Sequence, residues 1–166
     1  FGYMGGAMIT ASHNPKEYNG FKLCSENATP LSGDNGLPQI KSIVRDGSFK
    51  LAGKPGTISK REILTDYILH CLSFINIPKL KPFKIAIDAG NGVAGIVLKR
   101  LFHKLPFEPI ELFWEPDGNF PNHAPNPLIP ENNRKLKEVI IKKELDFGVS
   151  FDGDADRMFI MDEKGN

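Results

Sequence analysis

Three aspartates at alternate positions, followed directly by an arginine, form the most informative segment of the sequence. Asp152, Asp154 and Asp156 come after an apolar stretch that ends at Phe151, and Arg157 follows them. In a curled turn the three carboxylates can converge on one hard cation, because such cations prefer oxygen ligands. Adjacent carboxylates repel one another unless a cation or an arginine neutralises them. Arg157 is placed to bind a carboxylate or a phosphate oxygen beside the metal ion.

Two other interpretations of this acidic segment stay open at the level of the sequence. With Glu163 at the twelfth position, the segment imitates an EF-hand calcium loop. Arg157 stands where that loop requires glycine, however, and the flanking residues favour strands over helices. The segment could also be a solvated acidic turn without a ligand.

A second segment with chemical potential runs over residues 10–15, with the sequence TASHNP. Ser12 stands where a predicted strand passes into a turn, and such a corner presents a side chain outward, as a nucleophile requires. His13 is its direct neighbour, which is not an indication of a Ser-His-Asp triad. Lys22 follows shortly after the turn and could stabilise a transferring phosphoryl group. The alternatives are an ordinary Ser/Asn/Pro turn and a solvated surface lysine.

A glycine-rich segment over residues 88–95, DAGNGVAG, follows a predicted strand and opens a predicted helix. It satisfies the G-x-G-x-x-G pattern of dinucleotide-binding proteins, with Glu108 or Glu111 at about the distance of the ribose-binding acid. The alternative is a tight strand-to-helix crossover that needs glycine for steric reasons.

A proline-rich segment over residues 116–127, PDGNFPNHAPNP, cannot be a regular element. It is either one wall of a cleft or a surface loop. His123 within it has no partner at metal-ligand spacing, and we assign it no role.

The elements around these segments alternate between strands and helices, which predicts an α/β fold with a mainly parallel or mixed sheet covered by helices on both faces. Asn19-Gly20 is a hairpin-type turn signal. Ser59 and Glu62 form a capping-box pattern at the start of a helix. The expected strands cover 6–10, 84–88, 109–114, 147–151 and 158–161, and the expected helices cover 37–45, 59–75, 93–105 and 130–144.

Length and composition exclude several classes of protein. The chain has 166 residues, of which 40% are hydrophobic and 25% charged, and its net charge is +1. These values argue against disorder, nucleic-acid binding and attraction to an anionic membrane. Cys24 and Cys71 form no disulfide framework. With no signal peptide visible, we expect a cytoplasmic protein. The absence of an initial methionine leads us to expect a piece of a longer chain, and the sequence does not predict an oligomeric state.

In combination, three motifs of this chain resemble those of the α-D-phosphohexomutase family, and within it the bacterial phosphomannomutase/phosphoglucomutase branch. They are TASHNP at 10–15, NGFK at 19–22 and DGDADR at 152–157. The glycine-rich and proline-rich segments are also similar to that family's second domain. The resemblance covers essentially the whole chain. It implies two incomplete phosphohexomutase-type domains, over residues 1–55 and 56–166.

The resemblance also implies an activity and a role for each site residue. Members of the family convert hexose 1-phosphate to hexose 6-phosphate through a phosphoserine and a 1,6-bisphosphate, so glucose 1,6-bisphosphate is an implied activator and hexose phosphates are the implied partners. Ser12 would be the phosphoserine and would complete a Mg²⁺ site with the three aspartates. Arg157 would bind near the phosphate of this serine. Lys22 would contact the transferring phosphate and assist proton transfer. The phosphate-binding loop would contain His13, Asn14 and Asn19.

The family's third and fourth domains, with their sugar-binding and phosphate-binding loops, are not in this sequence. We therefore expect a mutase as the parent protein and little or no mutase activity from these 166 residues alone. Two alternatives are a Mg²⁺-dependent sugar-phosphate phosphatase and a non-catalytic remnant that binds metal or sugar phosphate. The choice among mannose, glucose and glucosamine phosphates is not readable here.

Overall fold

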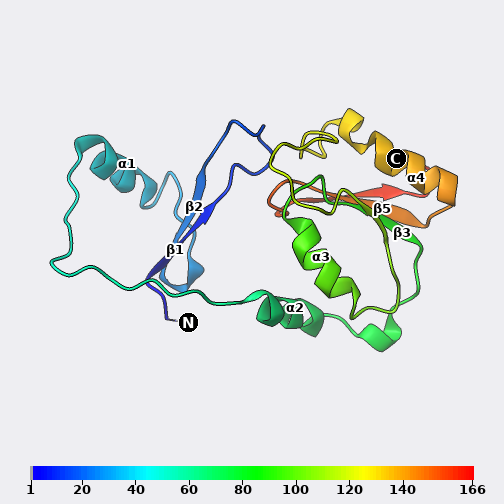
Figure 1. Cartoon of the computed structure of the whole chain (residues 1–166), viewed down its shortest axis with the longest axis horizontal. Coiled ribbons are helices and arrows are strands. Elements are labelled where there is room, and N and C mark those ends of the chain that lie inside the picture. Colours follow the sequence, from blue (N-terminus) through cyan, green and yellow to red (C-terminus); the bar gives the residue numbers. More distant parts are fainter. Residues whose placement is uncertain (1) are drawn as a thin grey trace. The chain divides into compact units, whose positions relative to one another are not determined.

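The computed structural model describes residues 2–166, which form two compact units (Figure 1). The first unit comprises residues 2–10 and 20–61, and the second comprises Ala11–Asn19 and Glu62–Asn166. The loop that carries Ser12 therefore belongs with the second unit, although the strands on either side of it belong to the first. Among the described residues, no helix is long and apolar enough to cross a membrane.

The first unit is built on an antiparallel pair of strands, β1 (Gly5–Ile9) and β2 (Phe21–Ser25). A single turn of 3-10 helix, Glu26–Ala28, and the helix α1 (Leu37–Asp46) follow. The two strands are joined by the whole of residues 10–20, so Asn19-Gly20 is not a tight turn between them, contrary to the sequence-based expectation. None of the described residues of this unit is buried, and even Met8 and Phe21 on the paired strands are exposed. The strand pair therefore has no hydrophobic core of its own.

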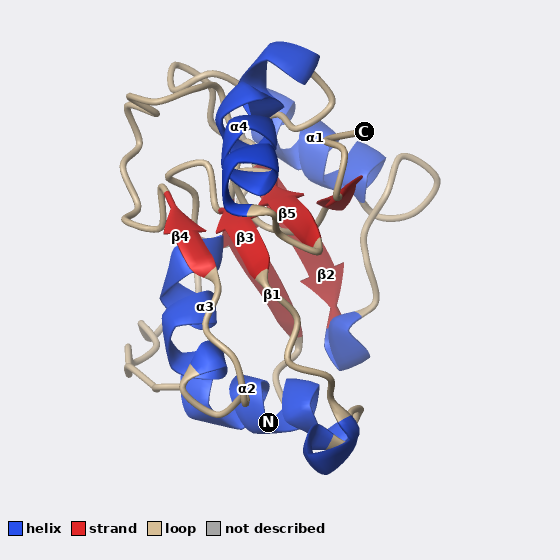
Figure 2. Ribbon diagram, turned by 90° about the vertical axis from the view of Figure 1, so that its right-hand side faces the viewer, coloured by secondary structure: helices blue, strands red, loops and turns tan. Residues whose placement is uncertain are grey.

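The second unit contains a four-stranded sheet in the order β4-β3-β5-β6. Figure 2 labels three of its strands, β4, β3 and β5, side by side. The strands are β3 (Ile85–Asp88), β4 (Ile110–Leu112), β5 (Phe147–Phe151) and β6 (Met158–Asp162). Strand β3 runs parallel to both β4 and β5, whereas β6 is antiparallel to β5. The predicted α/β class with a mixed, mainly parallel sheet is confirmed.

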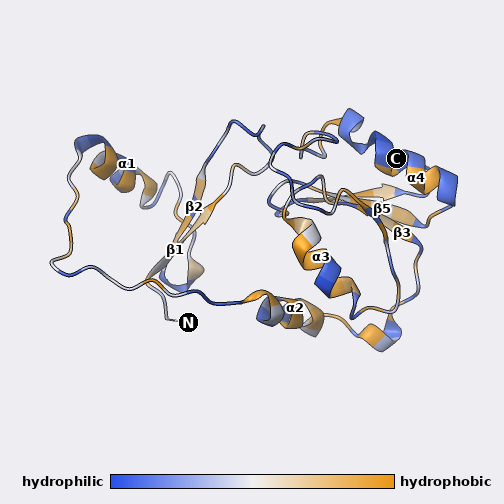
Figure 3. Cartoon of the chain, viewed as in Figure 1, coloured by the Kyte–Doolittle hydropathy of each residue, from blue (hydrophilic) through white to orange (hydrophobic). Residues whose placement is uncertain are grey.

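Helices α3 (Ala94–Phe102) and α4 (Arg134–Lys143) pack on opposite faces of this sheet. Alternate residues of β3 point to opposite faces, as in any strand. Ile85 and Ile87 belong to the core cluster on the α3 side, and Ala86 belongs to the cluster on the α4 side. Figure 3 shows the matching pattern in α4, which has hydrophilic residues along much of its length and a hydrophobic stretch among them. The sheet edge at which β3 and β5 end is thereby held rigidly between two layers.

The helix α2 (Leu64–Ser73) begins later than the capping box predicts. Ser59 lies outside the helix, and the predicted reciprocal cap does not form. Instead, the carboxylate of Glu62 accepts hydrogen bonds from the amides of Leu64 and Thr65, at 3.0 and 3.5 Å. A carboxylate at this position satisfies the unpaired amides of the first turn without a serine. Likewise, the stretch expected to be one helix over 130–144 starts as a 3-10 helix, Pro130–Asn133, before α4.

We expect Ile140→Ala to lower the free energy of unfolding by about 3 kcal/mol. The side chain of Ile140 on α4 is fully buried against β5, and shortening it leaves a cavity. Gly148 of β5 leaves the space that the Ile140 side chain occupies. The matched control is Ile141→Ala, at an exposed position on the same helix, which should cost less than about 1 kcal/mol. Chemical denaturation of both variants measures the difference, and equal losses would contradict this description of the core.

Candidate active site

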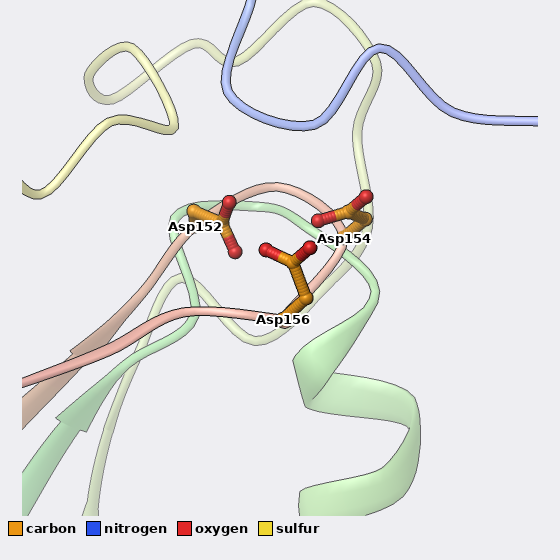
Figure 4. Close-up of side chains that lie close together, drawn as sticks. All are labelled: Asp152, Asp154 and Asp156. Carbon is orange, nitrogen blue, oxygen red and sulfur yellow. The ribbon is translucent and has the colours of Figure 1, made fainter. Parts of the chain in front are cut away.

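The three aspartates lie on the turn between β5 and β6, and their side chains converge (Figure 4). One carboxylate oxygen from each of Asp152, Asp154 and Asp156 lies within 4.8 Å of the others. Asp152 is fully buried, Asp154 is half-buried and Asp156 is exposed. Oxygen ligands at such separations can share one hard cation. Because strands flank the turn on both sides, the EF-hand interpretation is wrong.

Arg157 closes this turn by binding Asp152. Its Nε donates to Oδ2 of Asp152 at 2.9 Å, and its backbone amide donates to Oδ1 at 3.2 Å. Nη2 lies 2.7 Å from Oδ2 and forms an ion pair with it. A weaker ion pair joins Nε to Asp156 at 3.5 Å. Three carboxylates and one guanidinium leave a formal charge of −2 on the turn, which favours a divalent cation.

Ser12 lies against the aspartate turn, although 140 residues separate it from Asp152 in the chain. Its hydroxyl donates to Oδ2 of Asp152 at 3.0 Å and accepts a hydrogen bond from Nη2 of Arg157 at 2.8 Å. The backbone φ angle of Ser12 is 55°, in the left-handed region that residues other than glycine rarely adopt. Such conformations persist where surrounding contacts impose them, and they concentrate at functional sites.

Gly153 allows this close approach between the two segments. A Cβ atom at position 153 would collide with the backbone carbonyl oxygen of Ser12, and it would also touch Pro125. The backbone of the serine turn therefore rests directly on the backbone of the aspartate turn. Glycine is the residue that permits such contact.

His13 also faces Arg157. Its Nδ1 is in hydrogen-bond contact with Nη2 of Arg157 and lies 3.4 Å from the hydroxyl oxygen of Ser12. The ring is therefore positioned beside the serine hydroxyl by the same guanidinium that binds Asp152.

Three further residues predicted for the site are Asn14 and Asn19, on the serine loop, and Lys22, on β2. Asn14 and Asn19 are exposed on the serine loop, where the Asn14 amide donates to the carbonyl of Ala11 at 3.1 Å and so closes the turn around Ser12. Lys22 lies exposed on β2 in the first unit, in register with Met8, and its role stays a prediction.

The glycine-rich segment supports the aspartate turn from behind. The backbone amide of Val93 donates to the carbonyl of Gly153 at 3.1 Å, and Gly92 lies so close to Gly153 that a Cβ atom there would collide with it. Gly95 packs against the carbonyl of Trp114 in the same way. Gly92 and Gly95 therefore serve close packing of backbone on backbone, which favours the steric interpretation of this segment over the dinucleotide interpretation.

Sequence reasoning missed a buried pair beside this site. Nε2 of His123 lies 3.1 and 3.2 Å from the two carboxylate oxygens of Asp88, at the end of β3. The side chain of His123 is 11% exposed and that of Asp88 is fully buried. The two residues are 35 positions apart and belong to different motifs, so no local spacing signal could have joined them. The available signal was chemical: Asp88 ends an apolar strand and needs a buried partner.

Comparison with known proteins identifies the family to which this architecture belongs. The model of the phosphoglucomutase/phosphomannomutase alpha/beta/alpha domain II matches residues 64–165, and that of domain I matches residues 1–51. The chain belongs to the phosphoglucomutase/phosphomannomutase family. The larger of the two matches covers the sheet, the aspartate turn and the glycine-rich segment.

Relatives of this phosphoglucomutase/phosphomannomutase chain are much longer than the chain itself. It is 46% identical over 162 residues to a protein of Xanthomonas campestris named phosphohexose mutases, a match that covers 97% of the chain and 36% of the relative. A phosphomannomutase of Vibrio cholerae is 41% identical over 170 residues, which is 99% of the chain and 37% of the relative. The chain thus spans little more than a third of the relatives it matches.

Comparison with a solved structure also supports membership of the phosphoglucomutase/phosphomannomutase family. The crystal structure of a phosphoglucomutase/phosphomannomutase family protein from Burkholderia thailandensis superimposes with a TM-score of 0.87 at 34% identity, over 98% of the chain and 34% of that protein. The predicted family resemblance is therefore confirmed on both sequence and fold.

Proposed function

We propose that the chain carries the phosphoserine and metal-binding part of a phosphohexomutase that interconverts hexose 1-phosphate and hexose 6-phosphate. The observation that carries the proposal is the contact of the Ser12 hydroxyl with both Asp152 and Arg157. A nucleophile that accepts and returns a phosphoryl group needs cationic groups around it, and little further covalent machinery. In domain terms, residues 1–55 form part of the first domain and residues 56–166 form the second.

Ser12 in this proposal is the residue that holds the phosphoryl group between turnovers. In the first transfer, the bond between phosphorus and Oγ of Ser12 breaks while a bond to a sugar hydroxyl forms, which gives a 1,6-bisphosphate. In the second, Oγ attacks the other phosphoryl group, the bond between its phosphorus and the sugar oxygen breaks, and the proton of the serine hydroxyl passes to that sugar oxygen. Arg157 donates hydrogen bonds to the transferring group from a position 2.8 Å from Oγ. Lys22 is proposed to contact the transferring phosphate and to assist proton transfer, and His13, Asn14 and Asn19 are proposed to form the phosphate-binding loop.

The donor set on the aspartate turn fits Mg²⁺, because it consists of carboxylate oxygens with an excess negative charge of −2. Asp152, Asp154 and Asp156 would hold the ion, with an oxygen of phosphorylated Ser12 as a further ligand. When bound, a Mg²⁺ ion supplies positive charge that neutralises phosphoryl oxygens. Asp152 also keeps the turn in shape, since its carbonyl accepts the backbone amide of Ala155 and its carboxylate accepts that of Arg157.

Ser12→Ala should abolish phosphorylation and lower mutase turnover at least about 10³-fold, because the atom that carries the phosphoryl group is missing. The test uses the protein encoded by the complete reading frame that contains this chain. It is incubated with labelled glucose 1,6-bisphosphate, the site of labelling is mapped by mass spectrometry, and conversion of glucose 1-phosphate and mannose 1-phosphate is followed. Ser59→Ala, at an exposed serine, is the matched control.

Two outcomes would overturn the proposal. Release of inorganic phosphate without an isomeric sugar phosphate would indicate a Mg²⁺-dependent phosphatase. Metal binding without labelling of Ser12 would indicate a non-catalytic remnant. For the 166-residue chain alone we propose little or no mutase activity, since binding energy that orients the bisphosphate comes from loops it does not contain.

A further inference from the structure

The pair formed by His123 and Asp88 lies outside the set of residues proposed to bind metal or phosphate. Asp88 ends β3, and its Oδ1 also accepts the backbone amide of Gly90 at 2.8 Å. His123 belongs to the proline-rich loop over 116–127, and its ring packs edge-on against Phe113 with 5.4 Å between the ring centres. The pair therefore fastens the proline-rich loop to the end of a central strand.

The contacts of His123 favour the protonated form of its ring. Nδ1 faces the backbone carbonyl of Ala124 at 2.9 Å, and Nε2 faces the carboxylate of Asp88. A carbonyl and an ionised carboxylate only accept hydrogen bonds, so these contacts favour a ring with a proton on both nitrogens. The ring is then an imidazolium, ion-paired with a buried carboxylate.

The charges around the ring agree with this assignment. Burial lowers the pKa of His123, but the hydrogen bond and the charge of Asp88, together with the carbonyl of Ala124, outweigh it and raise the pKa above the ordinary value of 6.5. Asp88 is the charged group that contacts the ring, whereas Phe113 and Ala124 bring uncharged groups. The next charged groups along the sheet edge are the aspartates and Arg157 of the turn after Phe151.

The proline-rich loop reaches the aspartate turn two residues after His123. Pro125 is fully buried. Two glycines let Pro125 pack closely between His123 and the aspartate turn. A Cβ atom at Gly90 would contact His123, Pro125 and the carbonyl of Phe151. A Cβ atom at Gly153 would contact Pro125 at 3.4 Å. Since packed backbones move together, a shift of His123 displaces Pro125 and with it the turn that holds Asp152.

The geometry points to His123 and Asp88 as positioning residues that hold the aspartate turn in its cation-binding shape through Pro125 and Gly153. The inference rests on the proposed function only in that the turn binds a divalent cation. The contribution of the ion pair is fully present below the unfolded pKa of about 6.5 and is lost as pH rises through the higher folded pKa.

The test measures Mn²⁺ binding to the protein encoded by the complete reading frame that contains this chain, by electron paramagnetic resonance at pH 6.5. We expect His123→Gln to weaken Mn²⁺ binding about tenfold, in the range found for residues that orient metal ligands without touching the metal. The matched control is His103→Gln, at an exposed histidine, which should leave the affinity unchanged. The double variant His123→Gln/Asp88→Asn should bind Mn²⁺ no more than about threefold more weakly than His123→Gln alone. Both variants lose the same contact, the ion pair between His123 and Asp88.

A second measurement on the unaltered protein does not depend on whether a variant folds. If protonated His123 favours the cation-binding shape, then linkage requires Mg²⁺ to raise the pKa of His123. A purely electrostatic effect of the added cation would lower it. We expect an NMR titration of the ring with and without Mg²⁺ to show the rise, and an unchanged or lowered pKa overturns the inference.

The two proposals fail in different ways. If the unaltered protein does not bind Mn²⁺, the metal site fails and the positioning role fails with it. If the unaltered protein binds Mn²⁺ and folded His123→Gln binds it equally well, only the positioning role is overturned.

Discussion

Asp152→Asn should weaken Mn²⁺ binding by about 100-fold or more and should also destabilise the second unit. The substitution keeps the size of the side chain but removes its charge. It also leaves a poorer acceptor facing three donors, the guanidinium and backbone amide of Arg157 and the hydroxyl of Ser12. Because Asp152 is fully buried, water cannot replace the lost interactions. The side chain of Arg157 is one-third exposed, which limits the loss of folding free energy to about 2 kcal/mol.

Glu163→Gln is the matched control for this experiment. Glu163 is exposed and lies close in sequence to the aspartate turn, so it tests for a general effect of removing one negative charge. Paramagnetic resonance of Mn²⁺ gives the affinities, and denaturation in the absence of metal gives the stabilities. Wild-type affinity in the folded Asp152→Asn protein would show that the cation, if any, binds elsewhere. A large loss in Glu163→Gln would return the EF-hand interpretation to consideration.

The regular elements that support the site could be predicted because each one has a local signal. Strand β5 has the predicted bounds, Phe147–Phe151, since its apolar run is closed by a charged turn. The parallel pairing of β3 with β4 and β5 follows from the helices between them. The start of α2 was predicted wrongly because Ser59 and Glu62 have the spacing of a capping box, while the first-turn amides are bound by Glu62 alone.

The site itself was only partly predictable from residue types. The convergence of three carboxylates follows from their alternate spacing on one turn. The contact between Ser12 and Asp152 has no local signal, and the family resemblance rather than the residues suggested it. Likewise, the glycines of the DAGNG segment gave no sign that they pack on Gly153, because close backbone contacts depend on tertiary structure. Long-range contacts of this kind decide where the chemistry is assembled.

Gly153→Ala should slow phosphorylation of Ser12 by about 100-fold while leaving the sheet folded. The added methyl group would collide with the Ser12 carbonyl oxygen, so the serine turn must move away from the aspartate turn. Its hydroxyl would then leave Asp152 and Arg157, which contact it at 3.0 and 2.8 Å. A displacement of about 1 Å in a reacting group is enough for a loss of this size. The measurement is the rate of labelling from glucose 1,6-bisphosphate in the protein of the complete reading frame.

Gly118→Ala provides the control, because a Cβ atom at Gly118 meets nothing within 4 Å. Both substitutions add one methyl group to a glycine in a loop of the second unit, so they differ chiefly in what that methyl group contacts. Circular dichroism checks that each variant keeps its helices and strands. If Gly153→Ala were labelled as fast as Gly118→Ala, the close packing of Ser12 on Gly153 would not be needed for phosphoryl transfer. The left-handed backbone conformation of Ser12, with a φ angle of 55°, would then require another explanation.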